Sequence, residues 1–367
     1  MDKRIRVAIL YGGKSSEHDV SLQSAKCVLD NLDPTRFELL PIAVDREGVW
    51  HAQDLGQLSR TTAEALPVDV SGGEVVLAAT HDGVVVQGRQ ERPIDVVFPV
   101  MHGPLCEDGS IQGMLELADV AYVGAGVLGS AICMDKYVAK RLVREAGIPT
   151  VEYLRLRAAQ WPSATSALRQ RVLAELGYPV FVKPAGLGSS VGVAKVTREP
   201  DLERAIGAAF AYDTKVLVER AVNAREIELA VLSALDPSAP PDVSVPGEIV
   251  PKDAFYSYER KYLDPEGAAL EIPARLTTEE RAEAQRIARE VFVLLECEGM
   301  ARIDLFLDKQ SGRFLFSEAN TIPGFTTISM YPKLWEASGL RYGDLLARLI
   351  ELALLRHERR RSLKRMR

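Results

Sequence analysis

The sequence has few cysteines, and none of them forms a pair with the spacing of a redox or zinc motif. A chain of 367 residues can bury a core that needs no disulfides, so these cysteines are not read as a disulfide framework. We therefore expect reduced thiols and a cytoplasmic protein. The four cysteines are Cys27, Cys106, Cys133 and Cys297.

Signals for membrane insertion and secretion are missing as well. No apolar run approaches the roughly 20 residues that a membrane-spanning helix needs. The first residues, "MDKRIRVAILYGG", run directly into a strand pattern without the apolar region and cleavage site of a signal peptide. We expect no membrane partner.

An excess of positive charge is also missing. The chain has 45 Lys and Arg against 51 Asp and Glu, a net charge of −6, which gives no case for a nucleic-acid partner. One basic stretch, residues 356–367, follows an apolar helical pattern at 342–355. Basic residues at a helix C-terminus favour the helix dipole. We interpret the stretch as a solvated helix end.

The sequence does contain a large apolar fraction, arranged in an α/β pattern. It is 47% hydrophobic, and its length predicts two or three domains. Short apolar runs at 6–13, 37–45 and 95–103 alternate with helical patterns at 21–32 and 110–120. Functional residues in such sheets gather at the carboxyl ends of strands. Glu17 and His102 each follow a predicted strand.

A glycine- and serine-rich run at 183–192, "KPAGLGSSVG", lies between two strand patterns. Glycine lets backbone N–H groups approach phosphate oxygens, serine hydroxyls add donors, and Lys183 adds charge. The spacing fits neither the P-loop nor the dinucleotide fingerprint. A dinucleotide-dependent oxidoreductase would use the opening turn "YGG" at 11–13, which lacks the required glycine spacing, so this class is set aside. The run predicts phosphates held under a β-hairpin, and the alternative is a surface turn.

Two strand patterns near the end of the chain carry the most specific polar cluster. Residues two apart on a strand share a face, so Arg302 and Asp304 lie together, as do Glu318 and Asn320. The turn-forming run 308–312 predicts a hairpin between them. Two carboxylates and an amide suit Mg²⁺, and a guanidinium suits phosphate or carboxylate. A cross-strand salt bridge on a solvated face is the alternative.

Other candidates are individually weak. Lys136 opens an amphipathic helix pattern at 134–149, where a lone lysine is usually solvated. Glu219 ends the apolar run 215–219, where a carboxylate could receive an adenine amino group, although a surface charge is the simpler interpretation. Glu226 likewise could be a ribose ligand, although a surface charge is again the simpler interpretation. The segment 251–273 is long for a connection and is predicted to be a lid.

Taken together, these motifs resemble the ATP-grasp enzymes, and specifically the D-alanine–D-alanine ligases. The resemblance runs almost from end to end, and several long motifs occur in order, which makes it specific. Cys106 departs from the glycine that the family often has before "EDG". The motifs are "GGKSSEHDVSLQSA" (12–25), "HGPLCEDGSIQGMLEL" (102–117), "MDK" (134–136), "FVKPAGLGSSVGVAKV" (181–196), "YERKYL" (258–263), "ARIDLFL" (301–307) and "SEANTIPGFTTISMYP" (317–332).

The resemblance implies a fold class of α/β (α+β multidomain) type. This is an ATP-grasp fold with an N-terminal Rossmann-like (pre-ATP-grasp) domain. The expected domains are an N-terminal α/β domain at 1–123, a central ATP-grasp subdomain at 124–219, and a C-terminal one at 220–367 that carries the lid. ATP is expected between the last two, and a homodimer is expected through the N-terminal domain.

The resemblance also implies roles on the nucleotide side of the site. Two Mg²⁺ (or Mn²⁺) ions would be held on the ATP phosphates, with Glu318 bridging. Ser190 would support the phosphate loop. The implied metal ligands are Asp304, Glu318 and Asn320; the implied phosphate contacts are Lys136, Lys183 and Lys261; and the implied adenine and ribose contacts are Glu219, Val222 and Glu226.

On the amino-acid side, the resemblance implies that Glu17 binds the ammonium group of the first D-alanine and that His102 lies near that subsite. Ser189 and Tyr262 would join Glu17 in a hydrogen-bonded triad. The remaining implied groups are Arg302 and the N–H of Gly324 at the reacting carbonyl, and Ser329 and Met330 at the second D-alanine.

The implied reaction forms D-alanyl-D-alanine, a peptidoglycan precursor, through an acyl phosphate. ATP is needed because hydroxide is a poor leaving group. Tyr262, where ester-forming relatives typically have histidine, favours an amine as the second substrate. The alternatives are a ligase that uses D-serine or D-lactate and a non-catalytic nucleotide-binding regulator. A non-catalytic regulator would be expected to have lost a metal ligand or Arg302. Every expected position is filled in this sequence, which argues against that alternative.

Overall fold

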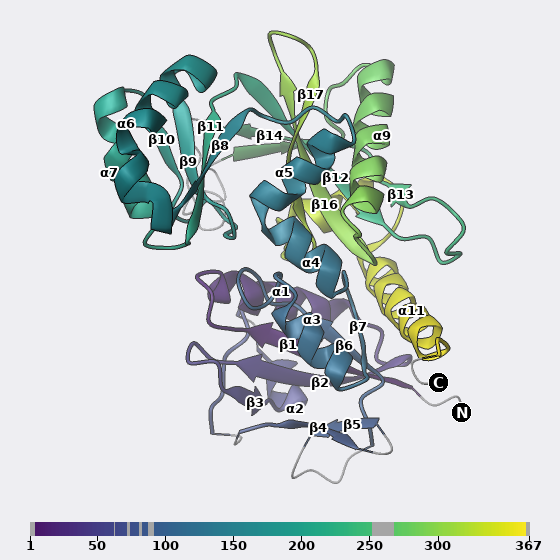
Figure 1. Cartoon of the computed structure of the whole chain (residues 1–367). Helices are drawn as coiled ribbons and strands as arrows, with labels where there is room; N and C mark the ends of the chain where they lie inside the picture. Colours follow the sequence, from purple (N-terminus) through teal and green to yellow (C-terminus); the bar gives the residue numbers. More distant parts are fainter. Residues whose placement is uncertain are drawn as a thin grey trace.

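The computed structural model describes residues 4–61, 63–71, 74–80, 83–86, 92–251 and 268–364. Three larger sheets follow one another along the described chain, each built mainly from one continuous stretch of sequence (Figure 1), and a fourth sheet is a two-stranded hairpin. We call the three larger ones the N-terminal, middle and C-terminal sheets. The predicted mixture of helices and sheets is confirmed.

The N-terminal sheet has the strand order β3-β2-β1-β6-β7, and its inner strands are parallel. The apolar run at 6–13 forms its centre, as predicted, because a strand buried on both faces has no polar side to alternate with. The elements are β1 Ile5–Gly12, α1 His18–Asn31, β2 Phe37–Val44, β3 Trp50–Ala52, α2 Leu55–Leu58, β6 Val96–Pro99, α3 Ser110–Leu117 and β7 Ala121–Tyr122, with a separate hairpin of β4 Leu77–Thr80 and β5 Gly83–Val86.

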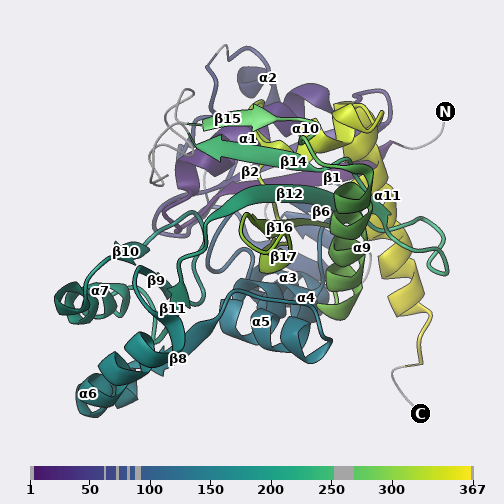
Figure 2. The same ribbon diagram turned by 90° about the horizontal axis from the view of Figure 1, so that it is seen from above.

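The middle sheet is antiparallel, with the order β10-β9-β11-β8. Helices α6 and α7 cover one face and project at one end of the molecule (Figure 2), while Lys183 and Glu219 lie on the other face. The strands and α-helices are β8 Tyr153–Arg157, α6 Trp161–Arg171, β9 Val180–Pro184, β10 Ala194–Val196, α7 Leu202–Ala209 and β11 Lys215–Arg220. Ala158–Gln160 and Glu199–Asp201 are single 3₁₀ turns, and Val172–Leu176 continues α6 as a π-helix.

The C-terminal sheet has the order β15-β14-β12-β16-β17, with β13 beside β12. A capping box at Thr277 and Glu280 begins its long helix α9. The elements are β12 Ala224–Leu232, β13 Asp242–Val243, β14 Gly247–Pro251, β15 Ala268–Glu271, α9 Thr278–Leu294, β16 Met300–Asp308, β17 Phe314–Asn320, α10 Met330–Ala337 and α11 Tyr342–Arg361.

Two helices between the first and second sheets pack on the third. Helices α4 (Val127–Met134) and α5 (Lys136–Glu145) bury Ala139 and Val143 in one core with α9 and the C-terminal sheet. Asp135 follows the last residue of the first helix, and its side chain caps the second helix by accepting from two backbone N–H groups. The domain bounds at 123 and 219 stay a prediction, but this helix pair belongs by packing to the C-terminal sheet.

The basic helix end at α11 does more than face solvent. Arg356 is buried, donates to the carbonyls of Tyr122 and Gly124, and lies 4.2 Å over the Tyr122 ring. Arg360 pairs with Glu116. These contacts fasten the last helix to the end of the N-terminal sheet, which charge patterning alone did not predict.

None of the helices in the described part of the chain is long and apolar enough to cross a membrane. The four cysteines all lie in that part, and all are free thiols.

Candidate active site

The predicted hairpin is present, and a β-bulge orients it. Strands β16 and β17 pair Arg302 with Asn320 and Asp304 with Glu318, after which Leu305 pairs with Phe316. The extra residue in β17 lets Phe316 enter the core while Glu318 faces the same side as Asp304. The four predicted polar side chains therefore share one face.

Arg302 is held between two carboxylates. Its guanidinium donates to both oxygens of Asp304 at 2.7 and 2.8 Å, and its Nε lies 3.0 Å from Glu228 on β12. Asn320 also donates to Asp304, at 3.0 Å. Since Arg302 and Glu228 are both buried, these ion pairs fix the direction of the guanidinium. The alternative prediction, a cross-strand salt bridge, is also met, because Arg302 pairs with Glu228 on β12 as well as with Asp304 on its own strand, but the face is buried and not solvated.

The same face offers oxygen ligands that suit a hard divalent cation. Among the described residues, no three His, Cys, Asp or Glu side chains form a metal-binding group by themselves. The candidate set contains only two carboxylates, Asp304 and Glu318, and the amide of Asn320. Mg²⁺ is usually bound by one or two carboxylates and completes its shell with water and substrate phosphates, so this donor set fits it.

The glycine–serine loop lies directly against this hairpin. Lys136, the first residue of α5, donates to the carbonyl of Leu187 at 2.7 Å and lies 3.0 Å from Glu318. Ser189 and Ser190 both have left-handed φ values, 50° and 58°, which non-glycine residues rarely adopt. Nests of successive backbone N–H groups, which bind anions, are built from turns that contain left-handed residues, so these conformations fit the predicted phosphate role.

The third predicted group is a carboxylate held by two lysines. Glu219 is 2% exposed; Lys183 donates to its Oε2 at 2.8 Å, and Lys140 lies 3.1 Å from its Oε1. Burial opposes the charge on Glu219, but the two ammonium groups outweigh it and lower its pKa to about 2. Glu219 is therefore an ionised acceptor and not a surface charge.

The N-terminal sheet contributes a fourth group. Ser189 donates to Glu17, which stands just before α1, so the phosphate loop contacts the carboxyl end of β1. His102 donates from Nδ1 to the carbonyl of Ile322 at 3.0 Å, and a Glu107 carboxylate oxygen lies 3.6 Å from the same nitrogen. Burial would lower the pKa of His102, but Glu107 outweighs it and raises that pKa.

The loop after β17 is tightly closed. A Cβ atom at Gly324 would lie 2.7 Å from the Ser329 hydroxyl, which also accepts from the N–H of Thr326 at 3.0 Å. Only glycine fits that approach without movement. Met330 begins α10 with its side chain buried in the core, so a substrate contact from this residue would have to come from its backbone.

Four predicted residues remain. Val222 lies between β11 and β12, and Glu226 lies on β12 opposite Phe306. Burial opposes the charge on Lys183, but the carboxylates of Glu219, Glu318 and Glu226 outweigh it and raise its pKa, so Glu226 acts on this cluster. Lys261 and Tyr262, with most of the predicted lid, lie outside the described residues, so their roles stay predictions.

Comparison with known proteins agrees with this geometry over the whole chain. Residues 6–125 match the family model for the D-ala D-ala ligase N-terminus, and residues 142–351 match that for the D-ala D-ala ligase C-terminus. A D-alanine--D-alanine ligase A from Bradyrhizobium diazoefficiens is 50% identical, covering 100% of this chain and 99% of that one. The chain belongs to the D-alanine–D-alanine ligase family.

Other members of this family have similar sequences and backbones. A D-alanine--D-alanine ligase A from Chromobacterium violaceum is 48% identical over 96% of this chain and 95% of that one. The solved D-alanine-D-alanine ligase from Coxiella burnetii superposes with a TM-score of 0.84 at 35% identity, covering 98% of this chain and 96% of that one. The ATP-grasp fold predicted from the motifs is therefore confirmed.

A solved relative with a different second substrate in its name has a similar backbone. The VanG D-Ala:D-Ser ligase from Enterococcus faecalis superposes with a TM-score of 0.81 at 34% identity, covering 96% of this chain and 100% of that one. Within the D-alanine–D-alanine ligase fold, the choice of second substrate therefore depends on side chains and not on backbone architecture.

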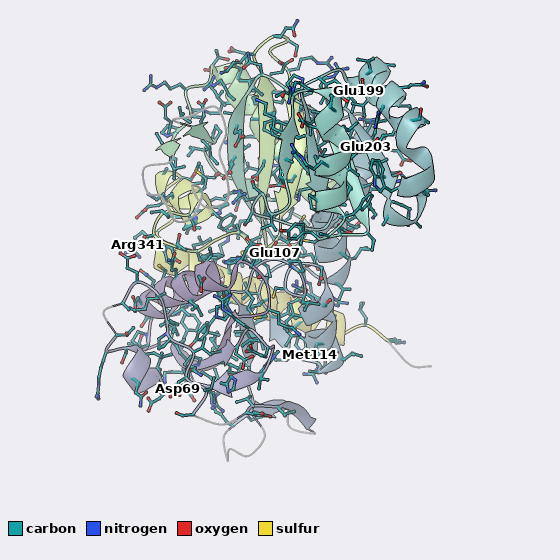
Figure 3. All side chains as sticks on the ribbon, turned by 90° about the vertical axis from the view of Figure 1, so that its left-hand side faces the viewer. Asp69, Glu107, Met114, Glu199, Glu203 and Arg341 are labelled. Atoms are coloured by element: carbon teal, nitrogen blue, oxygen red, sulfur yellow. The ribbon has the colours of Figure 1, made fainter. Side chains whose placement is uncertain are left out.

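Sequence reasoning missed three residues of the site in this ligase-family chain. Glu228 stands two residues after Glu226 on one strand face, and Lys140 stands four after Lys136 on one helix face, so periodicity could have indicated both. Glu107 sits in the "CEDG" turn and had no periodic signal. Figure 3 labels it where the N-terminal sheet meets the rest of the chain.

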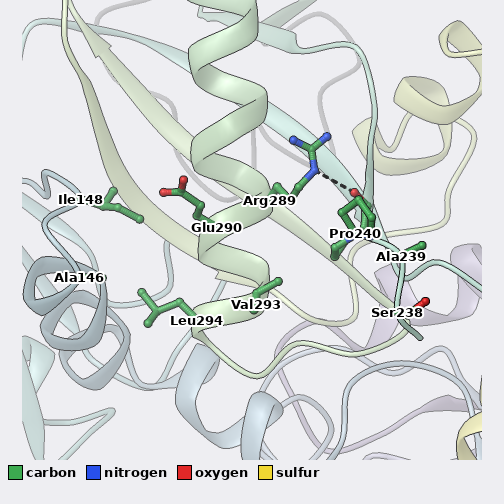
Figure 4. Close-up of a pocket in the computed structure, with 10 residues that line it drawn as sticks. Ala146, Ile148, Ser238, Ala239, Pro240, Arg289, Glu290, Val293 and Leu294 are labelled. Carbon is green, nitrogen blue, oxygen red and sulfur yellow. Dashed lines mark hydrogen bonds between the residues drawn. The ribbon is translucent and has the colours of Figure 1, made fainter. Parts of the chain in front are cut away.

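One cavity in the described residues shares no lining residue with this site. It has about 670 Å³ and lies between α9 and residues 238–241, where Arg289 donates to the Pro241 carbonyl (Figure 4). None of the predicted site residues lines it. A smaller cavity has Lys136, Gly188, Glu318 and Asn320 in its wall, and this one coincides with the cluster described above.

Proposed function

We propose that this chain joins two D-alanines into D-alanyl-D-alanine, with conversion of ATP to ADP and phosphate, for peptidoglycan precursor synthesis. It is a carboxylate–amine ligase. Relatives with this name align over the whole chain at up to 50% identity. The observation that carries the proposal from the structure is Lys136, which contacts both the glycine–serine loop and the Glu318 hairpin.

The nucleotide is assigned to the space between the middle and C-terminal sheets. Glu219 would accept from the adenine amino group, with Val222 and Glu226 at the base and ribose. Lys136 and Lys183 would contact phosphates under the loop that Ser190 supports. Each lysine is paired with a carboxylate here, at 3.0 and 2.8 Å, so nucleotide binding would exchange these ion pairs for phosphate contacts.

Asp304, Glu318 and Asn320 would hold the divalent cations. When bound, Mg²⁺ supplies charge neutralisation and orientation of the transferred phosphoryl group. Of these three residues, Glu318 also contacts Lys136, so it is placed to keep metal and lysine on the same phosphates.

The first D-alanine is assigned to the meeting point of Glu17, Ser189 and His102. Glu17 would bind its ammonium group, which leaves the carboxylate directed at the phosphates. That carboxylate would attack the γ-phosphorus of ATP, so that the bond to the β,γ-bridging oxygen breaks, ADP leaves and an acyl phosphate forms. The amine of the second D-alanine, held near Ser329 and residue 330, then attacks the acyl carbon and phosphate leaves.

Arg302 would stabilise the tetrahedral oxyanion of the second step, together with the N–H of Gly324. Its two carboxylate partners hold it rigidly, so the donor does not need to reorganise during the reaction. Lys261 and Tyr262 would complete the phosphate contacts and the Glu17 triad, and closure of the segment that carries them would exclude water from the acyl phosphate.

We assign the reaction to the cytoplasm, and a second copy of the chain is the proposed protein partner. Exposed apolar side chains support a homodimer: Met114 and Leu117 lie on α3, Val127 and Leu128 lie on α4, which contacts α3, and Leu117 is 90% exposed. Exposed patches of this kind mark association surfaces. Light scattering on Leu117→Asp should show monomers, whereas an unchanged dimer would exclude this surface.

The deciding experiment incubates the purified chain with ATP, MgCl₂ and D-alanine, and measures dipeptide and ADP together. We expect D-alanyl-D-alanine in equal amount to ADP. Parallel reactions with D-alanine plus D-serine or D-lactate test the alternative second substrates, which the comparisons do not favour. Absence of dipeptide from D-alanine alone would refute the proposal.

A further inference from the structure

Lys140 is a buried charge that the reaction scheme above does not use. Its side chain is 1% exposed, and its ammonium nitrogen has one partner among the described residues, Glu219 Oε1 at 3.1 Å. The geometry falls outside a regular hydrogen bond, so the contact is an ion pair. Burying an ammonium group costs free energy of folding unless an opposite charge pairs with it.

The pair joins the two layers between which the nucleotide is assigned. Lys140 belongs to α5, whose apolar face packs on the C-terminal sheet, while Glu219 belongs to β11 of the middle sheet. Lys136 lies one helical turn earlier on the same helix and contacts Glu318. Helix α5 thus places one ammonium group at the hairpin and a second, four residues later, at Glu219.

The two lysines at Glu219 differ in access. The Lys183 side chain is 18% exposed, which leaves it within reach of a nucleotide phosphate, whereas Lys140 is sealed from solvent. A phosphate can therefore draw Lys183 away, but not Lys140. Lys140 then remains as the fixed counter-charge on one carboxylate oxygen and limits rotation of the carboxylate group.

We propose that Lys140 is a positioning residue that holds Glu219 as an oriented, ionised acceptor and so selects a 6-aminopurine over a 6-oxopurine nucleotide. An ionised carboxylate only accepts hydrogen bonds. A 6-amino group donates to it, whereas a 6-oxo group presents a second acceptor and is repelled. The proposal rests on the assignment of Glu219 to the adenine base in the proposed function.

The test is equilibrium binding of ADP and IDP, in the presence of MgCl₂, to the full chain. The wild type should bind ADP at least about tenfold more tightly than IDP, the value of one hydrogen bond to a charged acceptor. In Lys140→Met this preference should fall to about threefold or less, and Lys140→Gln, which keeps a donor, should be intermediate. Lys309→Met, at an exposed turn, is the matched control and should behave as wild type.

An equal loss of ADP and IDP affinity in Lys140→Met would overturn the proposal, because it would reduce Lys140 to a packing role. An unchanged preference would do the same. If that variant does not fold, Lys140→Gln decides: its preference should fall by about a factor of two to three, and a wild-type preference refutes the proposal. The assay needs no ligation, so a chain that makes no dipeptide would still test Lys140.

Discussion

Lys136 and Glu318 form a 3.0 Å ion pair between the first turn of α5 and the end of strand β17. Lys136 also donates to Leu187 in the glycine–serine loop. One lysine therefore determines how close the proposed phosphate loop lies to the proposed metal ligands. Both side chains keep some exposure, so the pair can open when an anion or a cation competes for its members.

Glu318→Gln should abolish turnover while leaving the fold intact. An amide keeps the size of the side chain but loses the charge that a bridging metal ligand needs. We expect kcat to fall by about a hundredfold or more, and the MgCl₂ concentration for half-maximal activity to rise. The free energy of unfolding should change by less than about 1 kcal/mol, because the lost ion pair is partly exposed.

Glu336→Gln is the matched control for this substitution, since Glu336 lies exposed on α10. It should retain wild-type turnover and metal dependence. Full activity in Glu318→Gln would instead assign Glu318 to a structural ion pair and remove it from the metal site.

Ser189→Ala should weaken the amino-acid site more than the nucleotide site. The Ser189 hydroxyl donates to Glu17, and a hydrogen bond to a charged group contributes about 1.5–3 kcal/mol. Glu17 without this donor should bind an ammonium group in a less fixed position. We expect the KM for D-alanine to rise about tenfold or more, with the KM for ATP within about twofold of wild type.

Steady-state kinetics with each substrate varied in turn would measure this difference. Ser311→Ala is a suitable control, because it removes a hydroxyl–carboxylate bond to Asp308 in an exposed turn. A rise in the KM for ATP alone would place Ser189 with the phosphates and not with Glu17.

Gly324→Ala should destabilise the chain by steric overlap. Its Cβ would lie 2.7 Å from the Ser329 hydroxyl, which the N–H of Thr326 holds in place. Overpacking of this kind costs about 1–3 kcal/mol in the free energy of unfolding. Removing the hydroxyl as well, in Gly324→Ala with Ser329→Ala, should recover most of that loss in a urea titration. Additive losses would show that the two positions do not interact.

The sequence predicts the hairpin well because strand periodicity is local. Arg302 shares a strand face with Asp304, and Glu318 shares one with Asn320, as the two-residue repeat of a β-strand predicts. The bulge in β17 was not predictable in this way, because it arises from the competition between Phe316 for the core and Glu318 for the opposite face.

Partners from distant segments were much harder to predict than elements. Lys140 and Glu219 are 79 positions apart, and nothing in either segment alone indicates that they meet. The contacts of Arg356 with Tyr122 and Gly124 also join segments that lie far apart in the sequence. Such pairs depend on how α5 and α11 pack on neighbouring sheets, which is decided by burial of their apolar faces and not by the charged residues themselves.

The Glu219 carboxylate should make stability depend on pH in the acid range. Its pKa in the folded chain is about 2, below the ordinary 4.5, because two ammonium groups outweigh the effect of burial. A lowered pKa stabilises the folded state above pH 4.5, and this stabilisation is lost as the pH falls towards 2. The full shift corresponds to a contribution of about 3 kcal/mol.

Urea unfolding of wild type and Glu219→Gln between pH 5 and pH 3 would isolate this contribution. The substituted chain should be less stable at pH 5, because Lys140 and Lys183 lose their shared carboxylate, and the difference should shrink as the pH falls. Glu336→Gln, which changes an exposed carboxyl, should parallel wild type throughout. A constant difference between wild type and Glu219→Gln over this range would mean that Glu219 is not held ionised by the two lysines.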